Sequence, residues 1–217
     1  MSARLGERGG AAGTDALSPQ VAALVRFSAR IAAGSETELR EGCAEVLAAA
    51  VPTAWVEEAI LQAYLFAGFP RALNATREWR RASGVAAPSP DAMPAPDVDG
   101  WRAAGEATCE TVYGKFYEKL RHNIVALHPA LDEWMIVEGY GKILSRPGLE
   151  LRLRELCIVA ACVASAQDRQ LHAHLHGSLN AGASEGEVKA TLECLVGVVS
   201  AESLERGRLL LARVLGK

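Results

Sequence analysis

The amino-acid sequence predicts an all-α protein, a helical bundle, and three observations support this fold class. Ala, Leu and Val supply most of the apolar half of the 217 residues, and Ala and Leu are among the strongest helix formers. Apolar residues recur at helical spacing behind recognisable helix-start signals. No series of alternating Val, Ile and Thr segments bounded by turn residues occurs, so strands have little support.

The charge pattern and the apolar runs exclude several classes of partner. The formal net charge is −3, and Lys and Arg are interspersed with Asp and Glu. No basic stripe is available to neutralise phosphates, so we expect no nucleic-acid partner. No apolar run approaches the roughly 20 residues of a membrane span, and the N-terminus lacks a hydrophobic signal core. We therefore expect a cytoplasmic protein that does not bind a membrane.

The first third of the chain is expected to be a tail followed by a helical segment. Residues 1–16 show no periodicity and are expected to form a flexible tail. In residues 17–82, an N-cap Ser followed by Pro starts one helix, and a Ser-x-x-Glu capping box starts the next. A Gly-Phe-Pro sequence interrupts the third. The expected helices span about 19–33, 35–50, 52–67 and 71–81.

A Pro-rich stretch separates this segment from a larger helical domain. Residues 83–100 contain four Pro and few large apolar side chains, which is typical of a linker. Residues 101–217 are expected to form a second helical domain. Its helices are expected at about 101–122, 130–144, 149–166, 167–181, 184–199 and 201–215.

The two helical segments share a weak internal similarity. The series Leu39, Leu47, Val51, Val56 aligns at a constant offset with a second series in the other segment, and both cover helix, short turn and helix. The second series is Leu171, Leu179, Ala183, Val188. The alignment is compatible with an internally duplicated arrangement.

Glu155 is the first candidate catalytic residue. Beyond it, the helix expected at 149–166 contains only apolar or thiol side chains for more than two turns, so the carboxyl is expected to be partly buried. Burial disfavours the charged form of a carboxyl, which suits a general acid or base near neutral pH. The alternative is a structural salt bridge with Arg152, three residues earlier on the same side.

Gln167, Gln170 and His174 are the other candidates. On a helix they fall within about 60° of one another and form one polar stripe. His174 lies at the margin of the apolar stripe, where an imidazole could relay protons, although a histidine there can also be purely structural. His172 and His176 share a face in the manner of paired metal ligands, but no third ligand is evident, so we expect no metal.

Four linked segments resemble the core of the carboxymuconolactone decarboxylase family, which has the alkylhydroperoxidase D-like fold. They are Tyr140–Leu149, Arg154-Glu-Leu156, Gln170–His174 and Gly177–Gly182. Two stretches near residues 56–74 resemble the part that usually follows this core, but here they precede it. The resemblance therefore implies a duplicated or permuted helical bundle that assembles as a homo-oligomer.

The resemblance also implies two candidate activities. The peroxidase branch of the fold uses a Glu, a His and a Cys-x-x-Cys pair. Glu155 and His174 match the first two, but Gln167 and Gln170 occupy the cysteine positions. The decarboxylase branch lacks these cysteines. We therefore expect a cofactor-free lyase acting on a small carboxylated lactone or related acid. Glu155 would be the general acid/base, His174 its partner or a ligand of the substrate carboxylate, and Gln167 would orient the substrate.

Two alternatives stay open. The chain has five cysteines and no Cys-x-x-Cys. A thiol-dependent hydroperoxide reductase would have to use Cys157 or Cys162, because reduction by this route needs a thiolate of low pKa. In the other alternative the protein is a non-catalytic helical oligomer or binding module, in which Glu155 and His174 are structural.

Overall fold

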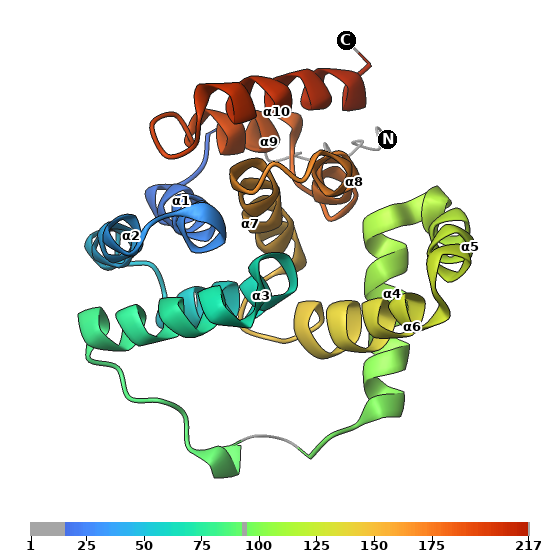
Figure 1. Cartoon of the computed structure of the whole chain (residues 1–217), viewed down its shortest axis with the longest axis horizontal. Helices are drawn as coiled ribbons and strands as arrows, with labels where there is room; N and C mark the ends of the chain where they lie inside the picture. The colour runs from blue at the N-terminus through green and yellow to red at the C-terminus, as the bar shows by residue number, and fades with distance from the viewer. Residues whose placement is uncertain (1–15, 93–94, 217) are drawn as a thin grey trace, which may run out of the picture.

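A computed structural model describes residues 16–92 and 95–216, so all but the last residue of the expected tail lies outside the described part of the chain. The described residues form an all-α bundle without a strand, which confirms the predicted fold class (Figure 1). The α-helices are α1 (Pro19–Ala33), α2 (Glu36–Ala48), α3 (Thr53–Ser83), α4 (Val98–Tyr113), α5 (Tyr117–Leu127), α6 (Pro129–Trp134), α7 (Leu151–Ala164), α8 (Asp168–Asn180), α9 (Glu185–Glu193) and α10 (Ala201–Val214).

Several expected helix boundaries were wrong. The helix expected at about 101–122 is two helices, because a short 3-10 turn at Gly114–Phe116 interrupts the run between α4 and α5. The second half of the helix expected at about 130–144 is a π-helix, Met135–Leu144. The helix expected to reach residue 199 ends at Glu193. Between α3 and α4, Asp97 caps α4, so the linker stops short of residue 100.

The structure contains two equivalent groups of helices. The first residues of α1 and α7 (Pro19 and Leu151) are 132 positions apart, and α2 and α8 are separated by the same offset over their whole length. A kink at Gly68, whose φ is 80°, divides α3 where Ser200 precedes α10 in the second group. The internal similarity in the sequence therefore corresponds to a repeat of three-dimensional structure.

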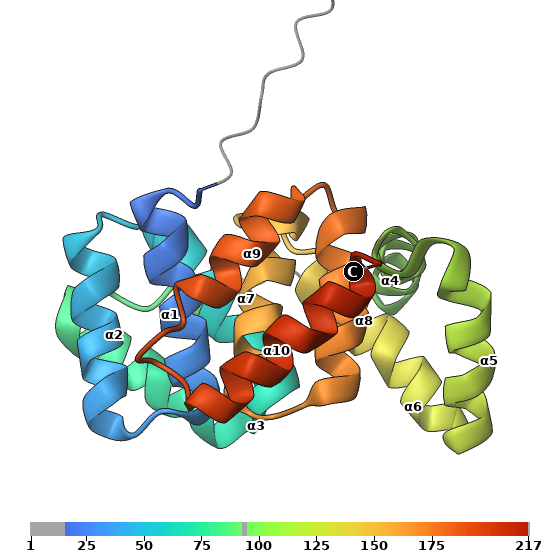
Figure 2. The same ribbon diagram turned by 90° about the horizontal axis from the view of Figure 1, so that it is seen from above.

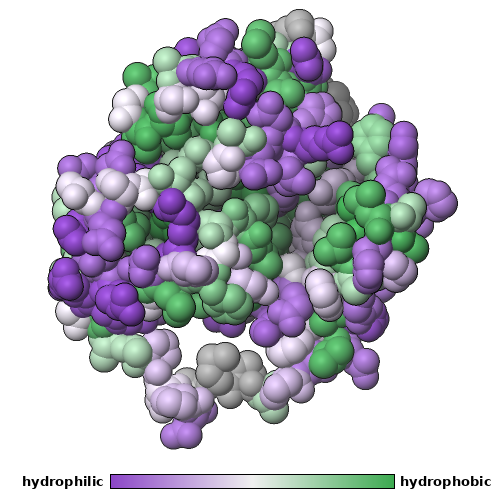
Figure 3. Space-filling view, in the orientation of Figure 1, coloured by the Kyte–Doolittle hydropathy of each residue, from purple (hydrophilic) through white to green (hydrophobic). Residues whose placement is uncertain are grey.

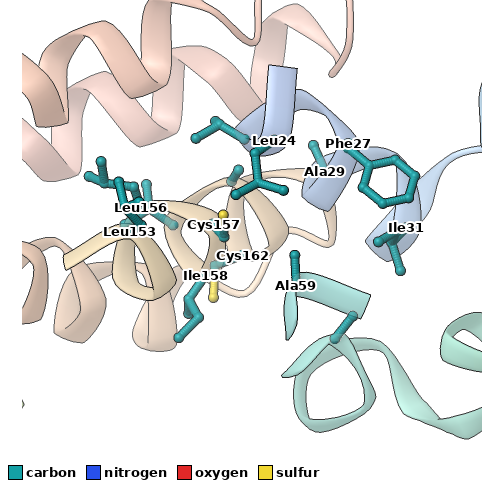
Figure 4. Packing of buried hydrophobic residues seen from close by; sticks show 14 of the residues in the cluster. Leu24, Phe27, Ala29, Ile31, Ala59, Leu153, Leu156, Cys157, Ile158 and Cys162 are labelled. Atoms are coloured by element: carbon teal, nitrogen blue, oxygen red, sulfur yellow. The ribbon is translucent and has the colours of Figure 1, made fainter. Parts of the chain in front are cut away.

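The core lies where the two repeats meet. α1 and α7 pack against each other at the centre, with α3 on one side and α9 and α10 on the other (Figures 1 and 2). Leu24 and Phe27 of α1 and Leu156 and Ile158 of α7 are completely buried in this core (Figure 4). Burying side chains of this size stabilises the fold by about 1.5–3 kcal/mol each.

A buried ionic network ties α3 to α7. The Arg154 guanidinium, with no exposed surface, donates to Glu58 at 2.8 Å, and Arg146 donates to the same carboxylate at 2.9 Å. Burial lowers the pKa of Arg154, while Glu58 opposes that shift. The N-terminal segment is thereby fixed on the second repeat of its own chain. No helix in the described residues is both long and apolar enough to cross a membrane.

Candidate active site

Glu155 lies on the most deeply buried helix of the bundle. From Leu153 to Val163 every residue of α7 is buried, and Glu155 has no exposed surface. The alternative partner expected for it, Arg152, is ion-paired with Glu187 and Glu150 instead. The neighbouring Arg154 is committed to Glu58. The salt bridge that could have made Glu155 purely structural is therefore not formed.

His174 is the partner of Glu155. The imidazole Nδ1 lies 2.8 Å from Glu155 Oε2, and the His174 residue is 4% exposed. Gly177, one turn further along α8, creates the space for this contact, because a Cβ there would lie 2.5 Å from the same carboxylate oxygen. From α3, the Phe66 ring packs edge-to-face on the imidazole at 5.4 Å between centroids. Three helices therefore fix the pair.

Among the described residues, Glu155 makes no ion pair other than its contact with His174. Its second oxygen, Oε1, is buried without a hydrogen-bond partner in the described part of the chain. Its charge acts on Tyr113, Tyr140, Cys109 and Cys162. Burial raises the pKa of Tyr113, Cys109 and Cys162 to about 12 and that of Tyr140 well above its usual value, and the Glu155 carboxylate adds to each rise. All four are therefore neutral near pH 7.

A Glu–His pair in such surroundings can share one proton across the contact between Nδ1 and Oε2. A lone buried carboxylate is strongly disfavoured, so a pair that is neutral overall is the arrangement that suits this burial. The pair is then either carboxylate with imidazolium or carboxylic acid with imidazole. In both states Nε2, the other imidazole nitrogen, has no hydrogen-bond partner among the described residues.

His174 forms part of the wall of a cavity of about 670 Å³. Its lining residues come from α3, α4, α5, α6, the π-helix and the first turns of α8. Glu155 is not among its lining residues and lies behind the imidazole. The polar residues that line the cavity besides His174 are Tyr64, Tyr113, Glu138, Tyr140, Arg169 and Gln170.

The two candidate glutamines occupy different places. Gln170 lines the large cavity and also a smaller neighbouring hollow of about 230 Å³, whereas Gln167 lines only the smaller one. Gln167 precedes α8 as its N-cap residue but makes no side-chain capping bond. The structure therefore places Gln170 beside His174 and sets Gln167 apart from the large cavity.

Sequence reasoning missed most of the cavity wall. Tyr64 and Phe66 come from α3, Tyr113 from α4 and Tyr140 from the π-helix, and only tertiary packing brings them to α8. Tyr140 was one available signal, because it begins the first segment that resembles the family, and Tyr64 and Phe66 lie in the resembling stretch near residues 56–74. π-helical segments are rare and occur frequently at functional sites, and this one supplies five of the lining residues: Met135, Glu138, Gly139, Tyr140 and Leu144.

The histidine pair and the thiols lie outside this arrangement. His172 and His176 are 5.0 Å apart between ring centroids, but the described residues contain no group of three side chains able to hold a metal ion. Cys157 and Cys162 are both buried, and burial raises the pKa of each thiol to about 12. Neither thiol lines the large cavity. These are the properties of structural cysteines.

Comparison with known proteins confirms the resemblance seen in the sequence. Residues 129–197, which include Glu155 and His174, match the model of the carboxymuconolactone decarboxylase family. Over 137 residues the chain is 30% identical to "Peroxisomal protein 2" of Schizosaccharomyces pombe (strain 972 / ATCC 24843). This match covers 61% of the chain and 63% of the yeast protein, which is less than two thirds of the relative's length.

Proposed function

We propose that the protein is a cofactor-free lyase that decarboxylates an organic acid, with His174 as the catalytic proton donor and Glu155 as its positioning residue. The observation that carries the proposal is the buried contact of 2.8 Å between Nδ1 and Oε2, which leaves Nε2 as the nitrogen available to a ligand in the cavity. These roles reverse the expectation from the sequence, because His174 lines the cavity and Glu155 lies behind it.

The reaction requires only proton transfer and electrostatics. When the carbon–carboxylate bond breaks, CO₂ leaves and the electron pair remains on the substrate, delocalised into an adjacent carbonyl as an enolate. His174 then donates the Nε2 proton to that carbon, and general acid catalysis of this kind contributes about 10²–10⁴-fold. The step leaves a buried Glu155 carboxylate beside neutral imidazole. This state is unfavourable, so the pair takes up a proton from water and is ready for the next turnover.

CO₂ release from a carboxylated muconolactone, measured with purified wild-type and variant protein, tests the proposal. His174→Asn should lower kcat by at least about 10²-fold. Glu155→Gln should lower kcat less and change the shape of its pH profile, because the amide holds the ring but cannot share its proton. His172→Asn is the matched control, on the same helix but outside the cavity lining, and should leave kcat unchanged. Wild-type turnover by His174→Asn would refute the assignment.

The thiol-dependent alternative has less support. Peroxide reduction needs a thiolate, and the pKa of the buried thiols of Cys157 and Cys162 is about 12. If the Cys157→Ser/Cys162→Ser double variant consumes peroxide at the wild-type rate, neither thiol takes part in peroxide reduction. If consumption is lost, the thiol-dependent activity becomes the better account.

We also propose a homo-oligomer in the cytoplasm. Large apolar side chains remain exposed on α5 and α6, including Leu127 at 73%, and a second copy could cover part of this surface. Sedimentation velocity tests the assembly. The name of the yeast relative refers to the peroxisome, so imaging a fluorescent fusion would distinguish the two compartments.

A further inference from the structure

Much of the wall of the large cavity is apolar. α5, α6 and the π-helix contribute Leu120, Ile124, Leu131, Trp134, Met135 and Leu144. Two of these side chains are open to solvent: Trp134 is 60% exposed and Leu131 is 46% exposed. The hydropathy of the surface shows the same concentration of apolar side chains over α5 and α6 (Figure 3). A ligand with an apolar body would remove this surface from water.

One positive charge stands at the edge of the same cavity. Arg169 is the only cationic Lys or Arg side chain among the described lining residues, and it makes no ion pair or hydrogen bond within the described part of the chain. The acidic lining residue Glu138 is already satisfied, because Tyr64 donates to it at 3.1 Å and Lys142 contacts it at 3.5 Å. An unpaired guanidinium beside an apolar wall suits a carboxylate, which it can bind through two parallel hydrogen bonds.

The position of Arg169 strengthens this charge complementarity. Arg169 is the second residue of α8, and the N-cap Gln167 makes no side-chain bond to the first turn. The first residue of α8, Asp168, is ion-paired with Arg206 at 3.6 Å, so the acidic side chain at this helix end does not occupy the Arg169 guanidinium. Arg169 and His174 line the same cavity. A carboxylate bound at Arg169 therefore leaves the rest of the ligand in the cavity whose wall includes the imidazole.

The cavity is large for a small lactone. A water molecule takes up about 30 Å³ of liquid, so 670 Å³ has room for on the order of twenty groups of that size. We infer that the cavity binds an amphipathic carboxylic acid, whose carboxylate is held by Arg169 and whose extended apolar body lies along α5, α6 and the π-helix. The inference rests on the proposed function for the reaction at His174, but it makes a separate claim about binding.

Isothermal titration of the full-length protein with straight-chain alkanoates from hexanoate to tetradecanoate, each below its critical micelle concentration, tests the inference. Affinity should rise by roughly fourfold per added methylene until the cavity is full. Arg169→Met should weaken decanoate binding by at least about tenfold and leave binding of methyl decanoate unchanged. Arg213→Met, an exposed and unpaired arginine on α10, is the matched control and should behave as wild type.

A second set of variants separates binding from catalysis. Ile124→Glu, which places a charge on the apolar wall, should weaken the acid and the ester alike. His174→Asn should bind decanoate as the wild type does, even where turnover is lost. The inference would be overturned if affinity did not depend on chain length or if Arg169→Met left it unchanged. It would also be overturned if no alkanoate bound because a second copy of the chain covered the cavity. Absence of CO₂ release with intact, Arg169-dependent binding would refute only the proposed function.

Discussion

Replacing His174 by leucine would isolate the energy of the buried pair. Nδ1 and Oε2 are 2.8 Å apart, Glu155 has no exposed surface, and its Oε1 has no hydrogen-bond partner in the described part of the chain. In His174→Leu the carboxylate would lose its only close polar partner. Breaking a buried pair in this way costs about 3–5 kcal/mol of unfolding free energy. Glu155→Gln keeps an acceptor for Nδ1–H, so its cost should be about 0.5–1.5 kcal/mol.

Urea unfolding followed by far-UV circular dichroism measures both costs. The deficit of His174→Leu should also depend on pH. An unpaired buried carboxyl favours its protonated form, so the folded variant binds more protons than the unfolded one and gains stability as the pH falls. The deficit should therefore be smaller at about pH 5 than at about pH 8. Equal costs for the two variants, together with a deficit that does not change with pH, would refute the view that Glu155 and His174 share a proton.

Three further predictions follow from particular contacts. Gly177→Ala places a Cβ 2.5 Å from Glu155 Oε2. The substitution should cost about 1–3 kcal/mol of unfolding free energy and should lower kcat more than it changes KM. Unchanged kinetics would contradict the proposed geometry. Glu58→Gln removes the counter-ion of the fully buried Arg154 and should cost about 3–5 kcal/mol in urea unfolding, whereas a loss below about 1 kcal/mol would mean that the network is dispensable. Burial raises the pKa of Cys157 to about 12, whereas the pKa of a thiol in the unfolded chain is about 8.5. The stability that the neutral thiol contributes is therefore complete below about pH 8.5 and is lost as the pH rises towards 12. Between pH 9 and 10 the wild type should lose about 1 kcal/mol more unfolding free energy than Cys157→Ala, and equal losses would contradict that pKa.

Local signals predicted the helices well, because they act within a few residues. The capping box at Ser35 and Glu38 forms with both of its hydrogen bonds, and so does the one at Ser184 and Glu187. Gly68 kinks the long helix where the sequence indicated a break. These features depend on backbone geometry and on side chains three residues apart, so no knowledge of the tertiary fold is needed to find them.

The site itself was only partly predictable, because its walls come from distant segments. The resemblance to the family and the helical stripe pointed to Glu155 and His174, and the structure brings them into contact. The same stripe also suggested Gln167, which lies apart from the large cavity. A helical wheel gives the direction in which a side chain points, but not which helix packs opposite. The partner of Arg152 was missed for this reason, because Glu187 belongs to α9.

The two repeats explain why a single Glu–His pair occurs among the described residues. The positions equivalent to Glu155 and His174 in the first repeat are Ala23 and Gly42, at the common offset of 132. A Cβ at Gly42 would already lie 2.9 Å from the ring of Phe27, so an imidazole cannot be accommodated there without repacking the core. The position equivalent to Gly177 is Glu45.

In the first repeat, an ion pair includes the position equivalent to Gly177, which adjoins the Glu155–His174 pair in the second. Glu45 accepts hydrogen bonds from Arg26 and Arg30, and these side chains fill the space that Gly177 leaves open in the second repeat. The first repeat still contributes to the site through α3, whose Phe66 packs on His174 and whose Tyr64 lines the cavity. The second repeat therefore supplies the Glu155–His174 pair, and the first repeat supplies part of the cavity wall around it.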